Sequence, residues 1–346
     1  MNKRLIIVLV LVLALVLAAC DSPQQQAPAP EAPGGTEPAA PGGDTGFPSR
    51  NIDGIVMWGA GGGTDSLMRP LSALAEEHLG VSVVVQNMTG AVGSIATQFV
   101  WDTTADGYTL LMGAENPALY QALQISDLTY ADFDAVFLVG DETVGIVVRP
   151  DSPHATFTDL INAALENPGS MTISTTGAGG LPWTVSSFIY EVTGATFNQI
   201  PYDSDASAIL AVLNGEVEFT VAKVQSAIEH YQAGNVNFLT MLSLDTVPTL
   251  PDVPLVTAEY PDFANFLPWG PFYGVFVRQG TDPAVIAALS QAFSAAAADP
   301  SYQQLLVDFN INFLGYTGQQ AQDWIAAWQT NTVTALENSG ALADVG

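Results

Sequence analysis

A repeated order of apolar strand, glycine-rich loop and helical segment restricts the fold of this 346-residue chain more than any other feature. Residues 55–58 form the first expected strand, glycines at 59 and 61–63 interrupt it, and leucines at 67, 71 and 74 follow at helical spacing. The segments 81–85, 90–93 and 95–99 repeat this order before a strand at 108–112. Because strands that alternate with helices build βαβ units, the pattern predicts an α/β fold.

The middle third of the chain repeats the same order twice more. Residues 171–174 and 199–202 are expected strands, each followed by a short loop and a helix, and 217–221 alternate as a further strand. The closing helices are expected after Asp282-Pro283, Asp299-Pro300 and Thr317, where Thr317 and Gln320 fit a capping box. Two sets of such units predict two similar α/β lobes.

The charge balance excludes one class of partner. Charged residues make up 12% and hydrophobic residues 48% of the chain, a composition of folded rather than disordered proteins. The 35 Asp and Glu against 7 Lys and Arg give a formal charge of -28. The imbalance comes from missing bases, since the share of acids is ordinary. A field of this sign repels a phosphate backbone, so nucleic acid is not an expected partner.

The N-terminus has the pattern of an export signal. Lys3 and Arg4 precede an apolar run of 15 residues, 5 through 19, which is shorter than the roughly 20 residues that cross a bilayer. We therefore expect residues 1–19 to be a cleaved signal peptide. Leu17-Ala18-Ala19-Cys20 resembles a bacterial lipobox, in which the cysteine carries the lipid. A plain secretory signal is the alternative.

Residues 20–48 are expected to form a tether. Cys20 is the single cysteine, so no disulfide can form within the chain and the thiol is available for a lipid. The 28 residues from 21 to 48 are mostly Pro, Gly, Ala, Gln and Glu and cannot support a core. Fully extended at about 3.1 Å per residue, this stretch reaches about 90 Å. The folded body is expected from Ser49.

The loop from Trp58 to Asp65 is the strongest candidate for binding an anion. Its glycines allow close approach to a ligand, and the N-terminus of the following helix supplies free N–H groups and partial positive charge. The simpler interpretation is a tight turn capped by Asp65. The loop lacks the lysine of a phosphate-binding P-loop and has Thr64 where the last glycine of a dinucleotide fingerprint would stand, which disfavours a nucleotide enzyme.

No catalytic or metal-binding constellation stands out. His78, His154 and His230 are widely separated, and His78 is expected to pack on an apolar helix face rather than to bind a metal. The sequence contains no GxSxG elbow, and its acids are dispersed. Neither a cofactor nor an enzymatic activity is expected.

A series of short motifs carries a family resemblance over residues 47 to the C-terminus. In chain order they are FPSR at 47–50, GGGTD at 61–65 with Arg69, QN at 86–87 with Gly90 and Gly93, DGYTL at 106–110, NPG at 167–169, TG at 176–177, PY at 201–202, NG at 214–215, LPDVP at 250–254 and WGP at 269–271. Together they resemble the substrate-binding receptors of tripartite tricarboxylate transporters, the Bug proteins. Each motif is weak alone, but their common order is specific.

The resemblance implies the type II periplasmic-binding-protein fold, an α/β architecture with two lobes joined by a two-strand hinge. The first lobe would comprise residues 49–146 and 264–346, and the inserted second lobe residues 147–263. The resemblance also implies a small organic dicarboxylate or tricarboxylate as ligand, held in the cleft between the lobes and passed to the permease subunits of the transporter. We expect a monomer that is lipid-anchored at the outer face of the cytoplasmic membrane.

Carried over by position, the resemblance gives a set of ligand-binding residues from four loops. They are Trp58, Gly61, Gly63, Thr64 and Asp65 in the first loop, Gly90 and Gly93 in the second, Ser174, Thr175, Gly177 and Gly179 in the third, and Tyr202 and Ser204 in the fourth. The sequence departs from the family at two places. The family has polar residues where this chain has Leu181-Pro182-Trp183, and it often has Asp where this chain has Ala222-Lys223.

Lys223 is expected to contact the ligand as well. It is the single lysine once the signal peptide is removed, and it follows the strand 217–221. In the cleft it would meet the far carboxylate of a dicarboxylate, with Trp58 and Trp183 as flat apolar walls. The alternative interpretation is that Lys223 is a surface cation near Glu229. An enzyme on the same two-lobed scaffold, or a surface adhesion module, remain as other functions.

Overall fold

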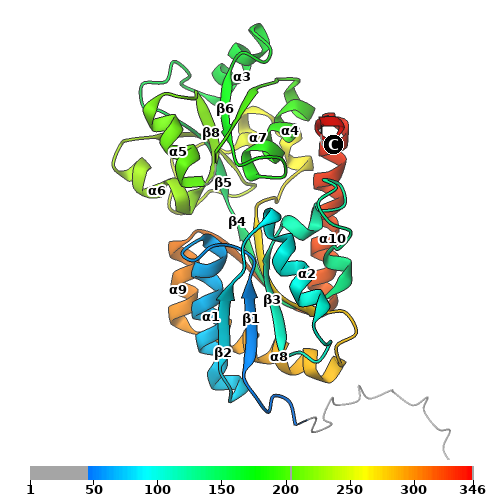
Figure 1. Ribbon diagram of the computed structural model, residues 1–346. Helices are drawn as coiled ribbons and strands as arrows, with labels where there is room; N and C mark the ends of the chain where they lie inside the picture. Colours follow the sequence, from blue (N-terminus) through cyan, green and yellow to red (C-terminus); the bar gives the residue numbers. More distant parts are fainter. Residues whose placement is uncertain (1–45, 203–204, 345–346) are drawn as a thin grey trace, which may run out of the picture. The chain divides into compact units, whose positions relative to one another are not determined.

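A computed structural model describes residues 46–202 and 205–344 as an α/β protein with two sheets (Figure 1). The predicted signal peptide, Cys20 and nearly all of the tether lie outside these residues. No helix in the described part of the chain is long and apolar enough to span a membrane.

The first sheet has six strands in the order β11-β4-β10-β3-β1-β2. Its strands are β1 (Ile52–Val56), β2 (Val83–Asn87), β3 (Thr109–Ala114), β4 (Phe133–Glu142), β10 (Phe272–Arg278) and β11 (Ile311–Tyr316). Its helices are α1 (Gly63–Leu79), α2 (Ser94–Asp102), α8 (Pro283–Ala297), α9 (Pro300–Asp308) and α10 (Gly318–Asn338). The short 3₁₀ turns are η1 (Ala91–Gly93), η2 (Asn116–Ala118) and η3 (Tyr130–Asp132). Helices α1, α8 and α9 contact one another, and α2 lies across the sheet from α1 (Figure 1).

The second sheet has five strands in the order β7-β6-β8-β5-β9. Its strands are β5 (Val144–Val148), β6 (Thr172–Thr175), β7 (Asn198–Pro201), β8 (Phe219–Lys223) and β9 (Asn237–Leu242). Its helices are α3 (Phe157–Glu166), α4 (Leu181–Thr193), α5 (Asp205–Asn214), α6 (Val224–Gln232) and α7 (Val256–Glu259). Two more 3₁₀ turns are η4 (Pro261–Asn265) and, after α10, η5 (Ala341–Asp344).

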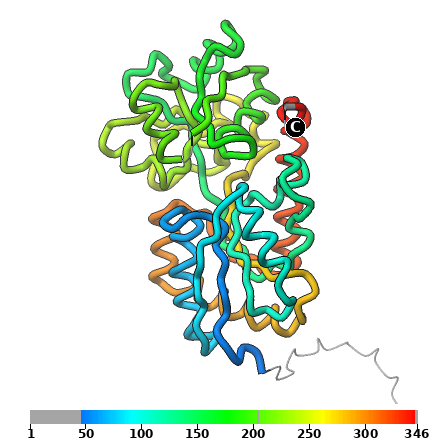
Figure 2. Tube along the Cα trace, in the orientation of Figure 1, coloured from blue at the N-terminus to red at the C-terminus, as the bar shows by residue number. Residues whose placement is uncertain are grey.

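The chain passes twice between the sheets, and the two passages lie side by side (Figure 2). The first is at Thr143, between β4 and β5, and the second leads into β10. The backbone N–H of Glu142 donates to the carbonyl of Pro271 at 2.8 Å. Gly270 is required by this close approach, because a Cβ at that position would lie 2.0 Å from the carbonyl oxygen of Glu142. The paired passages agree with the predicted two-lobed fold.

Aromatic packing continues from the second passage into α10. The rings of Trp269 and Trp328 stack with centroids 5.7 Å apart, and Phe188 of α4 meets Trp269 edge-on at 4.9 Å. Both indoles are satisfied, because Trp269 Nε1 donates to Thr332 Oγ1 and Trp328 Nε1 donates to the carbonyl of Gly270. Helix α10 thereby contacts both β4 and α4. Such pairs contribute beyond their buried area.

Two local predictions are wrong. His78 is exposed rather than packed, since the buried stripe of α1 ends on Ala75 and Leu79 and leaves His78 at its edge. Thr317 stands at the N-cap of α10, but its side chain makes no capping hydrogen bond. The first helical residue, Gly318, has a φ of +50°, so the turn departs from capping-box geometry.

Candidate functional site

The carboxyl ends of the parallel strands in both sheets lie beside the passage at Thr143. In the first sheet, the parallel strands β1, β2 and β3 end at Val56, Asn87 and Ala114. Strand β4 is antiparallel to β10, which is antiparallel to β3, so β4 runs in the same direction as β3 and ends at Glu142. In the second sheet, the parallel strands end at Thr175, Pro201 and Lys223. Lys223 pairs with Val144, the residue directly after the passage. Loops at the carboxyl ends of such strands form the ligand sites of open α/β sheets, so these loops are the candidate site.

Asp65 holds the first glycine loop together. Its carboxylate accepts hydrogen bonds from the backbone N–H of Gly61 at 3.0 Å, from Asn87 Nδ2 at 2.9 Å and from Arg69 at 2.6 Å. Asn87 also donates to the carbonyl of Trp58 at 2.8 Å. Burial alone would raise the pKa of Asp65, but these donors outweigh it and lower the pKa. The predicted ligand contact Asp65 therefore has its carboxylate engaged within the protein.

The start of α1 is close to side chains from β10 and α6. Gly62 at the N-cap offers no side chain, and the first turn carries Gly63 and the buried Thr64. A Cβ built on Gly63 would lie 2.9 Å from the hydroxyl of Tyr273 in β10 and 3.8 Å from Oε1 of Gln225 in α6. The uncapped N–H groups of a helix start favour an anion. This first turn therefore adjoins both β10 of the first sheet and α6, which packs on the second sheet.

The second glycine loop carries unusual backbone geometry. Gly90 and Gly93 flank Ala91 and Val92, which have φ values of +46° and +56°. A β-branched residue in the left-handed region is strained, and such strain collects at ligand sites. The hydroxyl of Tyr120 donates to the carbonyl of Val92 at 2.8 Å and holds the loop against the residues that follow β3.

The third loop is tied to the second sheet by the residues that precede it. The hydroxyl of Ser174 donates to the carbonyl of Ala208 in α5 at 3.0 Å and is therefore engaged within the protein. The hydroxyl of Thr175 accepts from the backbone N–H of Gly177 at 3.4 Å. The side chains of Ser174 and Thr175 are both buried. Their side chains shape the loop that leads to α4.

Two further predicted residues take different positions. A Cβ on Gly179 would lie 2.4 Å from Leu123 Cδ1, so the third loop touches the segment after β3 of the first sheet. The hydroxyl of Tyr202 instead donates to Glu216 at 3.2 Å in an exposed contact beside α5. Ser204, the remaining residue of the fourth loop, lies outside the described residues.

Lys223 stands in a cluster of charges where the sheets meet. Its Nζ lies 3.4 Å from Asp205 Oδ2 and 3.9 Å from Glu142 Oε2. Its side chain is 19% exposed, which excludes the surface cation considered from sequence. The hydroxyl of Tyr273 donates to Glu142 Oε2 as well. Glu115 completes the cluster, since its pKa responds to the charges of Lys223 and Asp205.

The ionisation of the cluster follows from its burial. Burial raises the pKa of Glu142 to about 7, against the opposing effects of Lys223 and Tyr273. Burial also raises the pKa of Glu115. For Lys223, burial lowers the pKa, but Tyr273, Asp205, Glu142 and Glu115 raise it by more, so the ammonium stays charged. The cluster therefore holds a charged ammonium next to two carboxyl groups, Glu142 and Glu115, whose pKa values are both raised.

Sequence patterns did not reveal Glu142, Tyr273 or Glu115 as members of this site. Glu142 lies inside the buried apolar stretch of β4 and β5, and Tyr273 is 131 residues away from it. The available signal was the pair Asp141-Glu142 itself, since two acids within a run of buried strand residues need partners. The predicted walls Trp58 and Trp183 are both partly buried, at the end of β1 and the start of α4.

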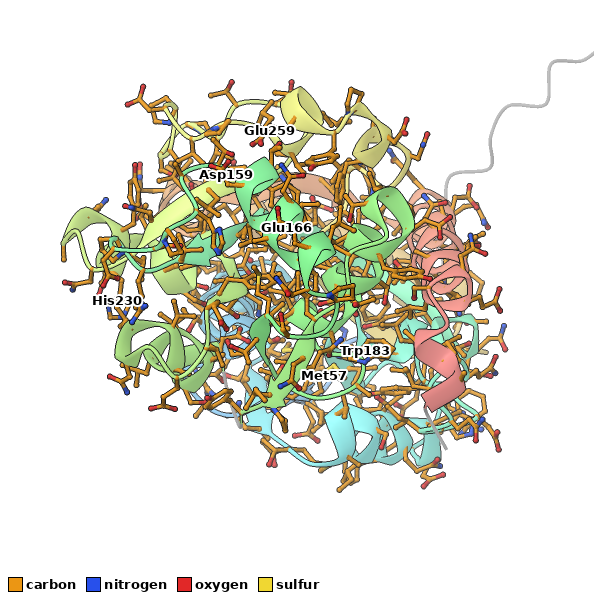
Figure 3. The ribbon with its side chains drawn as sticks, turned by 90° about the horizontal axis from the view of Figure 1, so that it is seen from above. Met57, Asp159, Glu166, Trp183, His230 and Glu259 are labelled. Carbon is orange, nitrogen blue, oxygen red and sulfur yellow. The ribbon has the colours of Figure 1, made fainter. Side chains whose placement is uncertain are left out.

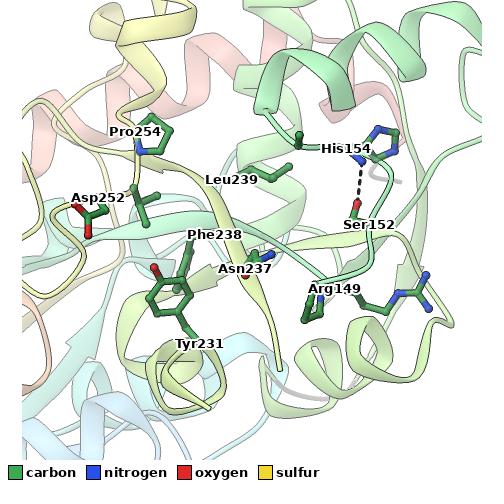
Figure 4. Close-up of a pocket in the computed structure, with 12 residues that line it drawn as sticks. Arg149, Ser152, His154, Tyr231, Asn237, Phe238, Leu239, Asp252 and Pro254 are labelled. Atoms are coloured by element: carbon green, nitrogen blue, oxygen red, sulfur yellow. Dashed lines mark hydrogen bonds between the residues drawn. The ribbon is translucent and has the colours of Figure 1, made fainter. Parts of the chain in front are cut away.

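A separate pocket of about 410 Å³ opens at the edge strand of the second sheet (Figure 4). It is lined by the start of the segment after β5, by β9 and by residues before α7, including Arg149, His154, Tyr231 and Asp252. It contains no residue of the four predicted loops. We therefore do not assign it to the candidate site.

The described residues include no group of three or more His, Cys, Asp or Glu that could hold a metal ion.

Several acids have structural roles around α3 (Figure 3). Asp159 accepts from the backbone of Thr156 in a capping box, and Glu259 accepts from the backbone and hydroxyl of Thr158. These carboxylates serve the helix start rather than a reaction centre.

The chain is similar to known solute receptors in both sequence and structure. The family model described as "Tripartite tricarboxylate transporter family receptor" matches residues 67–339. Protein BugT of Bordetella pertussis is 31% identical over 263 residues, which cover 75% of this chain and 79% of BugT.

Solved structures agree with the fold. The periplasmic binding protein BugD superposes with a TM-score of 0.74 at 25% identity, covering 85% of this chain and 99% of BugD. A Rhodopseudomonas palustris protein with adipate gives 0.73 at 22% identity, covering 85% of this chain and 98% of that one. MatC of R. palustris with bound malate gives 0.67 at 21% identity, with 86% and 100% covered. The sequence resemblance is confirmed, and the chain belongs to the family of tripartite tricarboxylate transporter receptors.

Proposed function

We propose that this receptor binds a small organic dicarboxylate or tricarboxylate between the loops of the two sheets and delivers it to the membrane subunits of a tripartite transporter. One observation carries the proposal: the uncapped first turn of α1 lies against Tyr273 in β10 of the first sheet and Gln225 in α6, which packs on the second sheet. An anion held there would be close to residues from both halves of the fold. The adipate and malate named for two proteins of the same fold support the ligand class.

In this proposal, backbone N–H groups of the glycine loops make most ligand contacts, because glycine allows close approach. The proposed contacts are Gly61, Gly63, Thr64, Gly90, Gly93, Thr175, Gly177, Gly179 and Lys223, with Trp58 and Trp183 as apolar walls. Asp65, Ser174 and Tyr202 would position the loops, since their polar atoms are bonded within the protein. Ser204 stays a predicted contact.

We further propose that the receptor is exported, keeps a lipid on Cys20 and works as a monomer. The lipobox and the coreless stretch that follows it support the anchor. A tether of about 90 Å, at about 3.1 Å per residue, would let the folded body meet the transporter from a fixed point on the membrane.

A ligand screen tests the function. We would measure thermal stabilisation and heats of binding with acetate, succinate, malate, citrate and adipate, and with 1,6-diaminohexane as a control that matches adipate in length. Binding at 100 times Kd adds about 2.7 kcal/mol of stability. We expect saturable binding of at least one carboxylate and none of the diamine.

The same samples separate the other functions. Recovery of unchanged ligand by NMR after prolonged incubation is expected for a receptor, whereas turnover would identify an enzyme on this scaffold. Absence of any saturable carboxylate would overturn the proposal and leave a surface module as the better explanation.

A further inference from the structure

Glu142 combines complete burial with an unused oxygen. Its side chain has no exposed area, and Oε2 accepts from Tyr273 and faces Lys223. The other oxygen, Oε1, is buried and has no hydrogen-bond partner among the described residues. A buried acceptor without a donor is unfavourable, so Oε1 favours the uptake of a proton or of a hydrogen-bond donor.

Burial, Asp205 and Glu115 disfavour the ionised form of Glu142, whereas Lys223 and Tyr273 favour it. Four groups act on it: Lys223 from β8, Tyr273 from β10, Asp205 from α5 and Glu115 after β3. Burial and the neighbouring carboxylate raise the pKa of Tyr273, which therefore remains neutral. Three carboxylates then share one ammonium. With all three ionised, the cluster carries a formal charge of -2, that is, +1 from Lys223 and -3 from the acids.

The same cluster adjoins the proposed anion site. The hydroxyl of Tyr273, which donates to Glu142, would lie 2.9 Å from a Cβ on Gly63 in the first turn of α1. A ligand carboxylate at this turn is one hydrogen-bonded group away from Glu142. A second anion at this distance favours the protonated form of the buried acid.

We propose that carboxylate binding is coupled to the uptake of one proton, which is held on Oε1 of Glu142. This inference rests on the proposed function. The proton comes from solvent, and a new O–H bond forms at Oε1, so that Glu142 is neutral when the ligand carboxylate arrives on the other side of Tyr273. Uptake removes one negative charge as the ligand adds one, so the local charge stays constant.

The pH dependence follows from the free and bound forms. Burial raises the pKa of Glu142 to about 7 in the free protein, and an adjacent anion would raise it further. Below pH 6, Glu142 is already protonated and binding takes up little. Above pH 7, the free protein has lost this proton and must regain it on binding. Affinity should therefore weaken as pH rises from 6.5 to 8.5, by up to tenfold per pH unit.

Calorimetry with the purified receptor tests the coupling. The tightest carboxylate of the screen is titrated at pH 7.5 in HEPES and in Tris, whose ionisation enthalpies differ. Wild type should take up about half to three quarters of a proton per ligand, because about a quarter of Glu142 is already protonated at this pH in the free protein. Glu142→Gln, whose amide is a permanent donor, should bind with no proton uptake and with a Kd that is flat from pH 6.5 to 8.5. Zero uptake by wild type across this pH range would overturn the inference even when carboxylate binds well.

Two variants control for indirect effects. Asp141→Asn changes the neighbouring acid, whose pKa burial likewise raises, to about 6, but which faces Asn312 instead of the site. It should keep the wild-type proton uptake. Tyr273→Phe removes the donor to Oε2 and should move the uptake to higher pH. Full uptake by Glu142→Gln would assign the proton elsewhere, whereas failure of every carboxylate to bind wild type would instead reject the proposed function.

Discussion

Nζ of Lys223 lies 3.9 Å from Oε2 of Glu142, although Lys223 ends a strand of the second sheet and Glu142 ends a strand of the first. The two residues meet because β5 begins directly after the passage at Thr143 and pairs Val144 with Lys223. The contact therefore links the two sheets beside their connecting passage. A ligand that competes for Lys223 would act on this link.

Lys223→Ala should weaken carboxylate binding by about ten- to a hundredfold, because a charge-assisted contact is worth roughly 1.5–3 kcal/mol. Titration calorimetry measures the change. Arg149→Ala is the matched control, since Arg149 pairs at 3.4 Å with the exposed Asp151 and belongs to none of the four loops. An affinity of Lys223→Ala within twofold of wild type would mean that the lysine only neutralises acids.

The sequence predicted which helices and strands exist better than it predicted where they begin and end. The expected strand 217–221 exists as β8, but it spans Phe219–Lys223, so Lys223 is the last strand residue and not a loop residue. Pairing with β5 sets this limit, and that pairing joins residues far apart in the chain. Similarly, β1 begins at Ile52, before the predicted Ile55, because Asp53 and Gly54 interrupt the apolar pattern but not the ladder.

The parts of the site that depend on local backbone conformation were predictable from the sequence. The contacts between residues far apart in the chain were not. The glycines at 61–63, 90 and 93 indicated both loops, and Gly61, Gly90 and Gly93 have the positive φ values that favour glycine. Nothing local joins Glu142 to Tyr273 or to Lys223, because these contacts arise from strand order across two sheets. Asp65 lies in the predicted loop, and its carboxylate accepts hydrogen bonds from Gly61 and Arg69, which sequence patterns did not indicate.

Asp65→Asn should lower the free energy of unfolding by about 1–2 kcal/mol at pH 7, since it removes the ion pair to the half-exposed Arg69. The lowered pKa of Asp65 means that its contribution is present above the ordinary pKa near 3.8 and is lost as the pH falls below that value. Urea unfolding at pH 7 and pH 3 measures both effects. Asp151→Asn, an exposed partner of Arg149, should change stability by less than about 0.5 kcal/mol. Equal effects of both variants would remove the structural role of Asp65.

Gly93→Ala should destabilise the receptor more than Gly177→Ala does. Both glycines have positive φ, +85° and +93°, so alanine costs about 1–2 kcal/mol at either position. A Cβ on Gly93 would also lie 2.1 Å from Met57 Cε, whereas nothing lies within 4 Å of one on Gly177. Overpacking adds about 1–3 kcal/mol at Gly93. Thermal unfolding measures the difference, and equal losses would contradict the packing of the second loop against β1.

Cys20→Ala should release the mature protein from the membrane fraction, because one lipidated cysteine is its proposed anchor. Expression with the native signal, membrane fractionation and mass spectrometry of the mature N-terminus measure anchor and lipid together. Ser22→Ala, two residues further on, is the control and should stay in the membrane fraction. Firm membrane retention of the cleaved Cys20→Ala chain would reject the anchor.

High salt should stabilise the receptor. Without the signal peptide, 35 acids face 7 - 2 = 5 bases, a formal charge of -30, and all five bases are engaged in the described structure. Most acids therefore repel one another without a nearby cation. Ions at 1 M screen these charges over about 3 Å, which should raise the Tm between roughly 0.1 and 2 M NaCl. The rise should shrink at pH 4, where many carboxylates are protonated. A Tm that is constant in NaCl at pH 7 would mean that the missing bases reflect compositional drift and not adaptation to salt.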